Sequence, residues 1–202
     1  MRWNRRRPTA AADPEPQPET VDFVAYATDC VISGRVALGT GRLTDLLAAR
    51  EDYDIDAVSL EVLNEDRIVV LHSAKVLRED LCLVAAAGPR GDPARRVRTR
   101  PHPIVARVGP YDVFGYVHAM PTADVLSAVH RRPIVPLTSG RIRYLRGTVP
   151  VEHNHDTILL NRDKIDWIET ATDEEVGLAR PPELPLAKNP RARDLTGELY
   201  TR

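Results

Sequence analysis

The chain has 202 residues, with 28 basic and 29 acidic side chains and a formal net charge of −1. Because the net charge is near zero, the overall charge does not favour binding to nucleic acid or to an acidic membrane. Two cysteines without a secretory leader argue against a disulfide scaffold. A hydrophobic share of 43% is sufficient for a packed core, so disorder throughout the chain is excluded.

The 17 prolines divide the chain into segments, because none of them falls within 21–87. Residues 1–20 hold four prolines and too little apolar surface to offset chain entropy, which predicts a disordered arm. A second proline cluster lies in 88–103, which we interpret as a linker, and a third lies in 170–202, which we interpret as a loosely ordered tail. Two blocks of similar size remain, and we call 21–87 lobe 1 and 104–169 lobe 2.

In lobe 1 the hydrophobic pattern predicts two strands, a short helix and further strands. Residues 23–27 and 31–38 have strand character, and 43–50 has helical spacing of its leucines. Val58, Leu60 and Val62 then alternate with other side chains, and two more short strands follow.

Lobe 2 repeats this order. Strands are predicted at 104–108 and 113–119, joined by a hairpin turn at 109–112 that contains proline at its second position. A helix is predicted at 123–131 with Thr122 as N-cap and Asp124 in its first turn, followed by strands of which Ile142 and Tyr144 mark the first.

The two lobes match each other in sequence as well as in pattern. Residues 32–36 align with 113–117 around a central glycine, at an offset of 81. Residues 76–84 align with 160–168 without a gap, at an offset of 84. We therefore predict a duplicated unit. The fold class is mainly β (α+β), with two similar β-β-α-β-β-β lobes, each a small bent sheet or partly open barrel with one short helix.

With this pattern, 21–168 resembles a group of bacterial proteins from high-GC lineages that carry a strand–Gly–strand–short-helix unit once or twice. The closing strand of that unit has an Asn-Arg-Asp-like start, here 161–165. The resemblance supports the domain organisation and implies no activity.

Two loops superficially resemble ligand-binding motifs. Gly39-Thr40-Gly41 precedes a predicted helix, but a dinucleotide fingerprint needs a third glycine where Thr44 stands. The alternating aspartates from Asp52 would open a calcium loop, but Ala57 and Leu63 occupy its glycine and glutamate positions. We expect a tight turn and a solvated connection, and no cofactor.

Metal binding and catalysis have little support in the sequence. His153, His155 and Asp156 lie together in one strand, but a zinc site needs a further ligand, for which His118 is the only obvious candidate. No nucleophile elbow is present, and the cysteines are expected to be small core residues: Cys30 and Cys82. We predict no metal ligand and no catalytic residue.

One candidate partner-binding surface is an aromatic stripe in lobe 2, formed by Phe114, Tyr116 and His118. The matching positions in lobe 1 are Ser33, Arg35 and Ala37. The alternative is that this stripe packs against the other lobe or against elements of its own lobe, because small sheets often bury both faces.

A candidate basic contact lies in the linker, where 88–100 carries five arginines and one acid: Arg90, Arg95, Arg96, Arg98 and Arg100, with Asp92. Such an extended arm could contact phosphates. It could equally dock on lobe 1, which is acidic, with 12 acidic and 6 basic residues. Lobe 2 from 104 to 168 has 6 acidic and 8 basic residues, and these opposite net charges favour contact between lobes.

These observations favour a cytoplasmic, non-enzymatic binding or assembly protein that contacts a protein partner or further copies of itself, with no transmembrane segment. The alternatives are a nucleic-acid-binding protein that uses the arginine-rich linker, and an enzyme with a site between the lobes.

Overall fold

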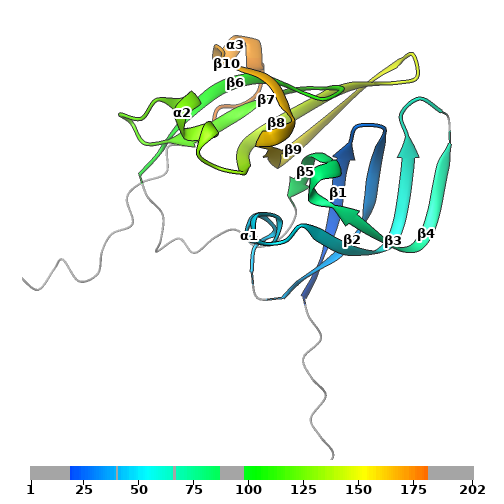
Figure 1. Ribbon diagram of the computed structural model, residues 1–202. Helices are drawn as coiled ribbons and strands as arrows, with labels where there is room; N and C mark the ends of the chain where they lie inside the picture. The colour runs from blue at the N-terminus through cyan, green and yellow to red at the C-terminus, as the bar shows by residue number, and fades with distance from the viewer. Residues whose placement is uncertain (1–18, 40, 66, 87–97, 182–202) are drawn as a thin grey trace, which may run out of the picture.

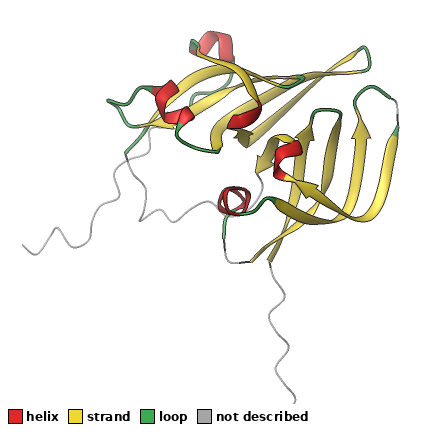
Figure 2. Cartoon of the chain, viewed as in Figure 1, coloured by secondary structure: helices red, strands yellow, loops and turns green. Residues whose placement is uncertain are grey.

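A computed structural model describes residues 19–39, 41–65, 67–86 and 98–181. The predicted arm, most of the predicted linker and the end of the predicted tail lie outside these residues. The described chain is mostly strand, with few short helices (Figure 2). Within these residues, ten antiparallel strands form one sheet that is not closed into a barrel. This confirms the predicted mainly β fold class.

Lobe 1 contributes the first five strands. Its elements are β1 (Glu19–Ala27), β2 (Cys30–Gly39), α1 (Leu43–Ala49), β3 (Asp52–Val62), β4 (Ile68–Leu77), the 3-10 turn η1 (Arg78–Asp80) and β5 (Leu81–Ala86). Within the sheet these strands follow the order β5-β1-β2-β3-β4.

Lobe 2 contributes the other five strands and a final helical turn. Its elements are β6 (Arg100–Val108), β7 (Tyr111–Ala119), α2 (Val125–His130), β8 (Ile134–Arg146), β9 (Val149–Asn161), the 3-10 turn η3 (Arg162–Lys164), β10 (Ile165–Thr170) and α3 (Asp173–Val176). The strand order β10-β6-β7-β8-β9 is the same as in lobe 1. Figure 1 shows the two curved halves, which meet where β5 lies beside β9.

The glycine that aligns the two lobes in sequence lies at a register shift in each half of the sheet. The pairing of β2 with β3 shifts register at Gly34, and the pairing of β7 with β8 shifts at Gly115. The facing strands carry non-glycine residues with positive φ, Ala57 at 52° and Ser139 at 47°. A Cβ on Gly34 would lie 2.9 Å from the carbonyl oxygen of Asp56, so the close approach of the two backbones requires glycine.

Two local predictions in lobe 2 need correction. The β6–β7 hairpin is present, but its two-residue loop is Gly109-Pro110, and Gly109 supplies the left-handed conformation at φ 56°. Helix α2 is capped by Asp124 and not by Thr122. The Asp124 carboxylate accepts a hydrogen bond from Ser127 N at 3.1 Å, and helical residues begin only at Val125.

The ends of lobe 2 are longer than predicted. Residues 100–103, assigned to the linker from their prolines, begin strand β6. Residues 171–181, assigned to the tail, include α3, which starts with a capping box between Thr172 and Glu175. Val176 is fully buried, so this segment packs on lobe 2.

Both hydrophobic cores draw side chains from both lobes. The first core consists mainly of lobe 2 residues but includes Tyr26 and Leu83, and the second consists mainly of lobe 1 residues but includes Ile134 and Leu159. The two lobes therefore share their interiors. Within the described residues, no helix has the length and apolar character needed to cross a membrane.

Candidate functional site: the lobe joint and the free sheet edges

The two lobes are joined by direct backbone pairing between β5 and β9. Leu83 lies opposite Leu160, Val84 opposite Leu159 and Ala85 opposite Ile158. All six residues are buried. The fold therefore makes its internal interface by adding the edge strand of one half to the edge strand of the other.

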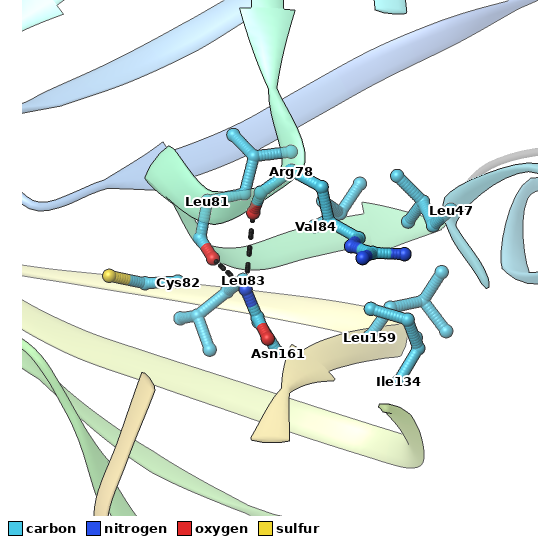
Figure 3. Close-up of a pocket in the computed structure, with 9 residues that line it drawn as sticks. All are labelled: Leu47, Arg78, Leu81, Cys82, Leu83, Val84, Ile134, Leu159 and Asn161. Carbon is cyan, nitrogen blue, oxygen red and sulfur yellow. Dashed lines mark hydrogen bonds between the residues drawn. The ribbon is translucent and has the colours of Figure 1, made fainter. Parts of the chain in front are cut away.

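A polar contact closes this joint at one end. Asn161, the last residue of β9, donates hydrogen bonds from Nδ2 to the carbonyl oxygens of Arg78 at 3.1 Å and Leu81 at 2.9 Å (Figure 3). Its Oδ1 accepts a bond from Asp163 N at 3.2 Å. One side chain of lobe 2 thus holds both ends of η1 in lobe 1. The void beside it measures about 10 Å³, which is about the space of one water and too small for any larger ligand.

The two histidines of β9 contact lobe 1 through one tyrosine. The Tyr26 hydroxyl lies 3.0 Å from His153 Nδ1 and 2.8 Å from His155 Nε2. Burial raises the pKa of Tyr26, and burial together with the neighbouring His153 lowers the pKa of His155. His118 lies elsewhere, between Thr99 and Thr138. Within the described residues, no group of three His, Cys, Asp or Glu side chains could hold a metal ion.

Aromatic rings surround this contact and form a cluster between the lobes. The ring of Tyr26 lies edge-on to Tyr111 at 5.4 Å and to Tyr144 at 6.1 Å. Tyr144 is in turn 5.8 Å from His153. The hydroxyl of Tyr111 donates to the carbonyl oxygen of Ala27. The cluster draws on strands of both lobes, which is why the sequence did not reveal it.

An open cleft of about 600 Å³ lies between the lobes next to this cluster. It is lined by residues of both: Thr28, Leu63, Asn64, Arg107, Pro110, Asp112, Arg143, Tyr144, Leu145, Gly147, Pro150, Val151 and Glu152. Its two carboxylates are in salt bridges, Asp112 with Arg107 at 3.0 Å and Glu152 with Arg143 at 2.6 Å. Arg143 also lowers the pKa of Glu152. Both carboxylates of the cleft are therefore held by arginine side chains.

The aromatic stripe of β7 faces other parts of lobe 2. Tyr116 is fully buried, and its hydroxyl donates to the carbonyl oxygen of Leu178 at 3.0 Å, beyond α3. The guanidinium groups of Arg141 and Arg143 lie over the Phe114 ring, at 4.8 and 5.1 Å from its centre. His118 and Phe114 are half-buried, so they retain some accessible surface while Tyr116 has none.

Only part of the candidate basic contact can be located. Arg98 and Arg100 are exposed, just before and at the start of β6. The other three arginines, Arg90, Arg95 and Arg96, lie outside the described residues.

Within the described residues the sheet has two free edges that the sequence did not reveal, β4 at one end and β10 at the other. Eight large hydrophobic side chains are exposed among the described residues, and five of them lie on these two strands: Ile68, Val70, Leu71, Leu77 and Trp167. Val70 is 77% exposed and Trp167 is 45% exposed. The run Ile68–Leu71 is a signal in the sequence, but an apolar run of that length is equally typical of a buried strand.

No family model, curated protein or solved structure matches this chain.

Proposed function

We propose that this chain is a non-enzymatic binding or assembly protein, built from a duplicated β-rich unit, and that the free edge of β4 is its main contact surface. The observation that carries this proposal is the character of β4. Its ten residues include one lysine, no proline and no acidic residue, and four large apolar side chains are exposed on it.

Edge strands of this kind are unusual in a monomer. Exposed edges are normally protected by several charges, a proline, a bulge or a covering element, because their unpaired N–H and C=O groups can pair with another strand. The pairing of β3 with β4 runs without a register shift, so no bulge turns this edge away. The joint between β5 and β9 supports the same interpretation, because it is an example within this chain of binding by strand addition.

The direction of the backbone groups on β4 allows a specific test. Arg78 N donates to Glu51 O just beyond the paired residues of β3 and β4. In an antiparallel pair the N–H groups of successive residues point alternately toward the partner strand and away from it, so this bond fixes the direction of each N–H group on β4. The N–H groups of Val76 and Ala74 therefore point toward β3, and that of Lys75 points to the free edge. Lys75→Pro removes an edge donor without removing a donor to β3, and Lys75→Ala is the matched control that keeps the donor.

The experiment compares three baits in affinity capture from native extract and in self-association assays: the wild type, Lys75→Pro and Lys75→Ala. We expect the wild type and the alanine variant to retain the same bound proteins, including any further copies of the chain, and the proline variant to lose them. Full retention by the proline variant, with its circular dichroism unchanged, would overturn β4 as the contact surface.

A second candidate function, nucleic-acid binding, is favoured by one observation. Arg141 and Arg143 lie over the ring of Phe114, and stacked guanidinium and aromatic groups are a common surface for unpaired bases. Titration with single- and double-stranded oligonucleotides at increasing salt tests it. Binding that weakens steeply with salt supports this candidate, and the absence of binding at low ionic strength removes it.

A further inference from the structure

We propose that the chain associates head to tail with further copies of itself, with β10 of one copy pairing antiparallel to β4 of the next. This contact would repeat the register of the β5–β9 joint. The proposal rests on the function proposed above and names the partner as a second copy of this chain.

The strand order carries the argument. Along the sheet, lobe 2 runs β10-β6-β7-β8-β9 and lobe 1 continues as β5-β1-β2-β3-β4. The internal joint thus pairs the last strand of one lobe with the first strand of the other. The two strands left free are the counterparts of the two strands that are joined, since β10 corresponds to β5 and β4 corresponds to β9. A second copy added at either end would therefore repeat a contact that the fold already makes.

The correspondence of β10 with β5 holds residue by residue. In lobe 1, β1 pairs with β5 so that Tyr26 faces Leu83, and the register shifts directly after Tyr26. In lobe 2, β6 pairs with β10 so that Arg107 faces Trp167, with a register shift at the same place. Trp167 therefore occupies the position of Leu83.

The correspondence of β4 with β9 is equally direct. Ile55 faces Ala74 in the pairing of β3 with β4, and Leu137 faces Ile158 in the pairing of β8 with β9. Each strand then ends at a 3-10 turn, η1 after Leu77 and η3 after Asn161. Ala74 therefore occupies the position of Ile158.

Applying the register of the joint to the free strands gives three pairs between copies. Trp167 would face Val76, Ile168 would face Lys75 and Glu169 would face Ala74. Lys75 would then lie diagonally across from Asp166 of the next copy. Within its own chain, Lys75 Nζ lies 3.1 Å from Asp52 Oδ2. The contact would remove from water the exposed surface of Trp167.

The backbone groups of both free strands are correctly directed for this register. In the joint, Arg162 N donates to Pro133 O, so the N–H of Leu159 points away from β8 and toward β5. Lys75, the counterpart of Leu159, points its N–H to the free edge in the same way. On β10, Ala171 N donates to Pro103 O, so the N–H of Ile168 also points outward. Ile168 and Lys75 would therefore form a hydrogen-bonded pair.

One difference predicts that the contact between copies is weaker than the joint. Leu77 stands at the position of Asn161 and cannot donate the two hydrogen bonds that hold η1. We therefore expect reversible, concentration-dependent association. Such a contact joins unlike surfaces, so it generates a ring if its rotation closes and a filament if it does not.

Two variants, each blocked at one edge, test the proposal in the full-length chain. Lys75→Pro blocks β4 and Ile168→Pro blocks β10. We expect wild-type sedimentation to show assembly that grows with concentration, and each proline variant alone to remain monomeric. An equimolar mixture should form a one-to-one dimer and nothing larger, because one variant contributes an intact β10 and the other an intact β4. The controls Lys75→Ala and Ile168→Val keep the N–H groups, so both should still assemble as the concentration rises, Lys75→Ala more weakly than the wild type because it removes the ammonium group placed near Asp166.

Three outcomes would overturn the proposal. The first is a wild type that stays monomeric up to its solubility limit. The second is self-association of Ile168→Pro at the wild-type level, which would mean that β4 pairs with β4. The third is a mixture that stays monomeric. If the wild type is monomeric and still captures another protein through β4, head-to-tail assembly is wrong and the proposed binding function survives.

Two further measurements remain decisive even if a proline variant fails to fold. Ala74→Cys and Glu169→Cys place thiols at a non-hydrogen-bonded pair, the close pair of an antiparallel ladder. In a Cys30→Ser background, with a mild thiol oxidant added to take up the two electrons of each disulfide, we expect a ladder of disulfide-linked chains, and little cross-linking when His72→Cys replaces Ala74→Cys. Equal cross-linking by both would overturn the register.

The last variant, Leu77→Asn, copies the polar contact of Asn161 onto the free edge. We expect it to tighten association by about tenfold, which corresponds to about 1.4 kcal/mol. Weaker association than the wild type would contradict the proposed register.

Discussion

Asn161 and Arg78 are 83 residues apart in the chain, and the side chain of the first donates to the carbonyl oxygen of the second across the joint between the lobes. The same Nδ2 also donates to Leu81. The corresponding residue of lobe 1 is Leu77, which is exposed at the sheet edge and makes no such contact, so Asn161→Leu tests what the buried amide contributes. We expect it to lower the free energy of unfolding by about 1–3 kcal/mol, since buried carbonyl groups lose their donor. Chemical denaturation measures this.

The control for this prediction is Asn154→Leu, which changes an exposed asparagine of the same strand. It should alter the free energy of unfolding by less than about 0.5 kcal/mol. Equal effects of the two substitutions would mean that the contact of Asn161 across the joint contributes nothing specific.

Acid should destabilise the protein through two half-buried histidines, His118 and His155. Burial lowers the pKa of His155 and of His118, so both are more readily protonated in the unfolded chain than in the folded one. The unfolded state therefore binds more protons, and the free energy of unfolding should fall as the pH drops below about 6.5. Denaturant unfolding between pH 5 and 8 measures the slope.

His155→Gln should reduce this slope, because it removes a ring that is held neutral against Tyr26 and His153. His130→Gln, at an exposed position, is the matched substitution with which the slope of His155→Gln is compared. A wild-type stability that rises toward low pH would contradict the prediction.

Gly34→Ala should be destabilising because the added methyl group has no space. Its Cβ would lie 2.5 Å from Ile55 Cγ2 and 2.9 Å from the backbone oxygen of Asp56, and the backbone cannot give way as a side chain can. We expect a loss of about 1–3 kcal/mol in thermal or chemical unfolding. Gly41→Ala is the control, since its nearest neighbour would be Leu38 O at 3.9 Å. The prediction fails if the two variants unfold alike.

Thr172→Ala should release α3 from lobe 2 without unfolding the sheet. It removes a capping box in which the Thr172 hydroxyl accepts from Glu175 N at 3.2 Å, at a cost of about 1 kcal/mol. Hydrogen exchange at the amides of Val176 and Gly177 should accelerate, while exchange in β7 stays slow. Thr170→Ala, which is exposed at the end of β10, should leave both unchanged. Faster exchange throughout the protein would show instead that α3 supports the whole fold.

The sequence could predict those parts of the fold that depend on local chemistry. The repeated glycine could be recognised in the sequence because the close approach of the neighbouring backbone excludes a Cβ at Gly34. The short helices could be predicted from the spacing of their apolar residues. The segment from Thr172 to Glu175 also carried a readable capping box, which its charged, proline-rich surroundings obscured. The composition of a segment was a weaker guide there than its individual residues.

The joint and the free edges could not be predicted in the same way. The pairing of Leu83 with Leu160 is between strands far apart in the chain, and it is set by packing of the whole sheet. Val84 of β5 and Val70 of β4 both belong to apolar runs, yet the first is buried and the second is 77% exposed. Only the position of each strand in the sheet distinguishes them.

Strand β5 has a consequence for how the protein unfolds. Its residues contribute to both interiors, since Leu83 belongs to one hydrophobic core and Val84 to the other. Melting of lobe 1 would withdraw β5 from both cores and expose the joined face of β9. Although the chain is built from two similar units, we expect a single cooperative transition in calorimetry, with equal van't Hoff and calorimetric enthalpies, and no stage at which one half stands alone.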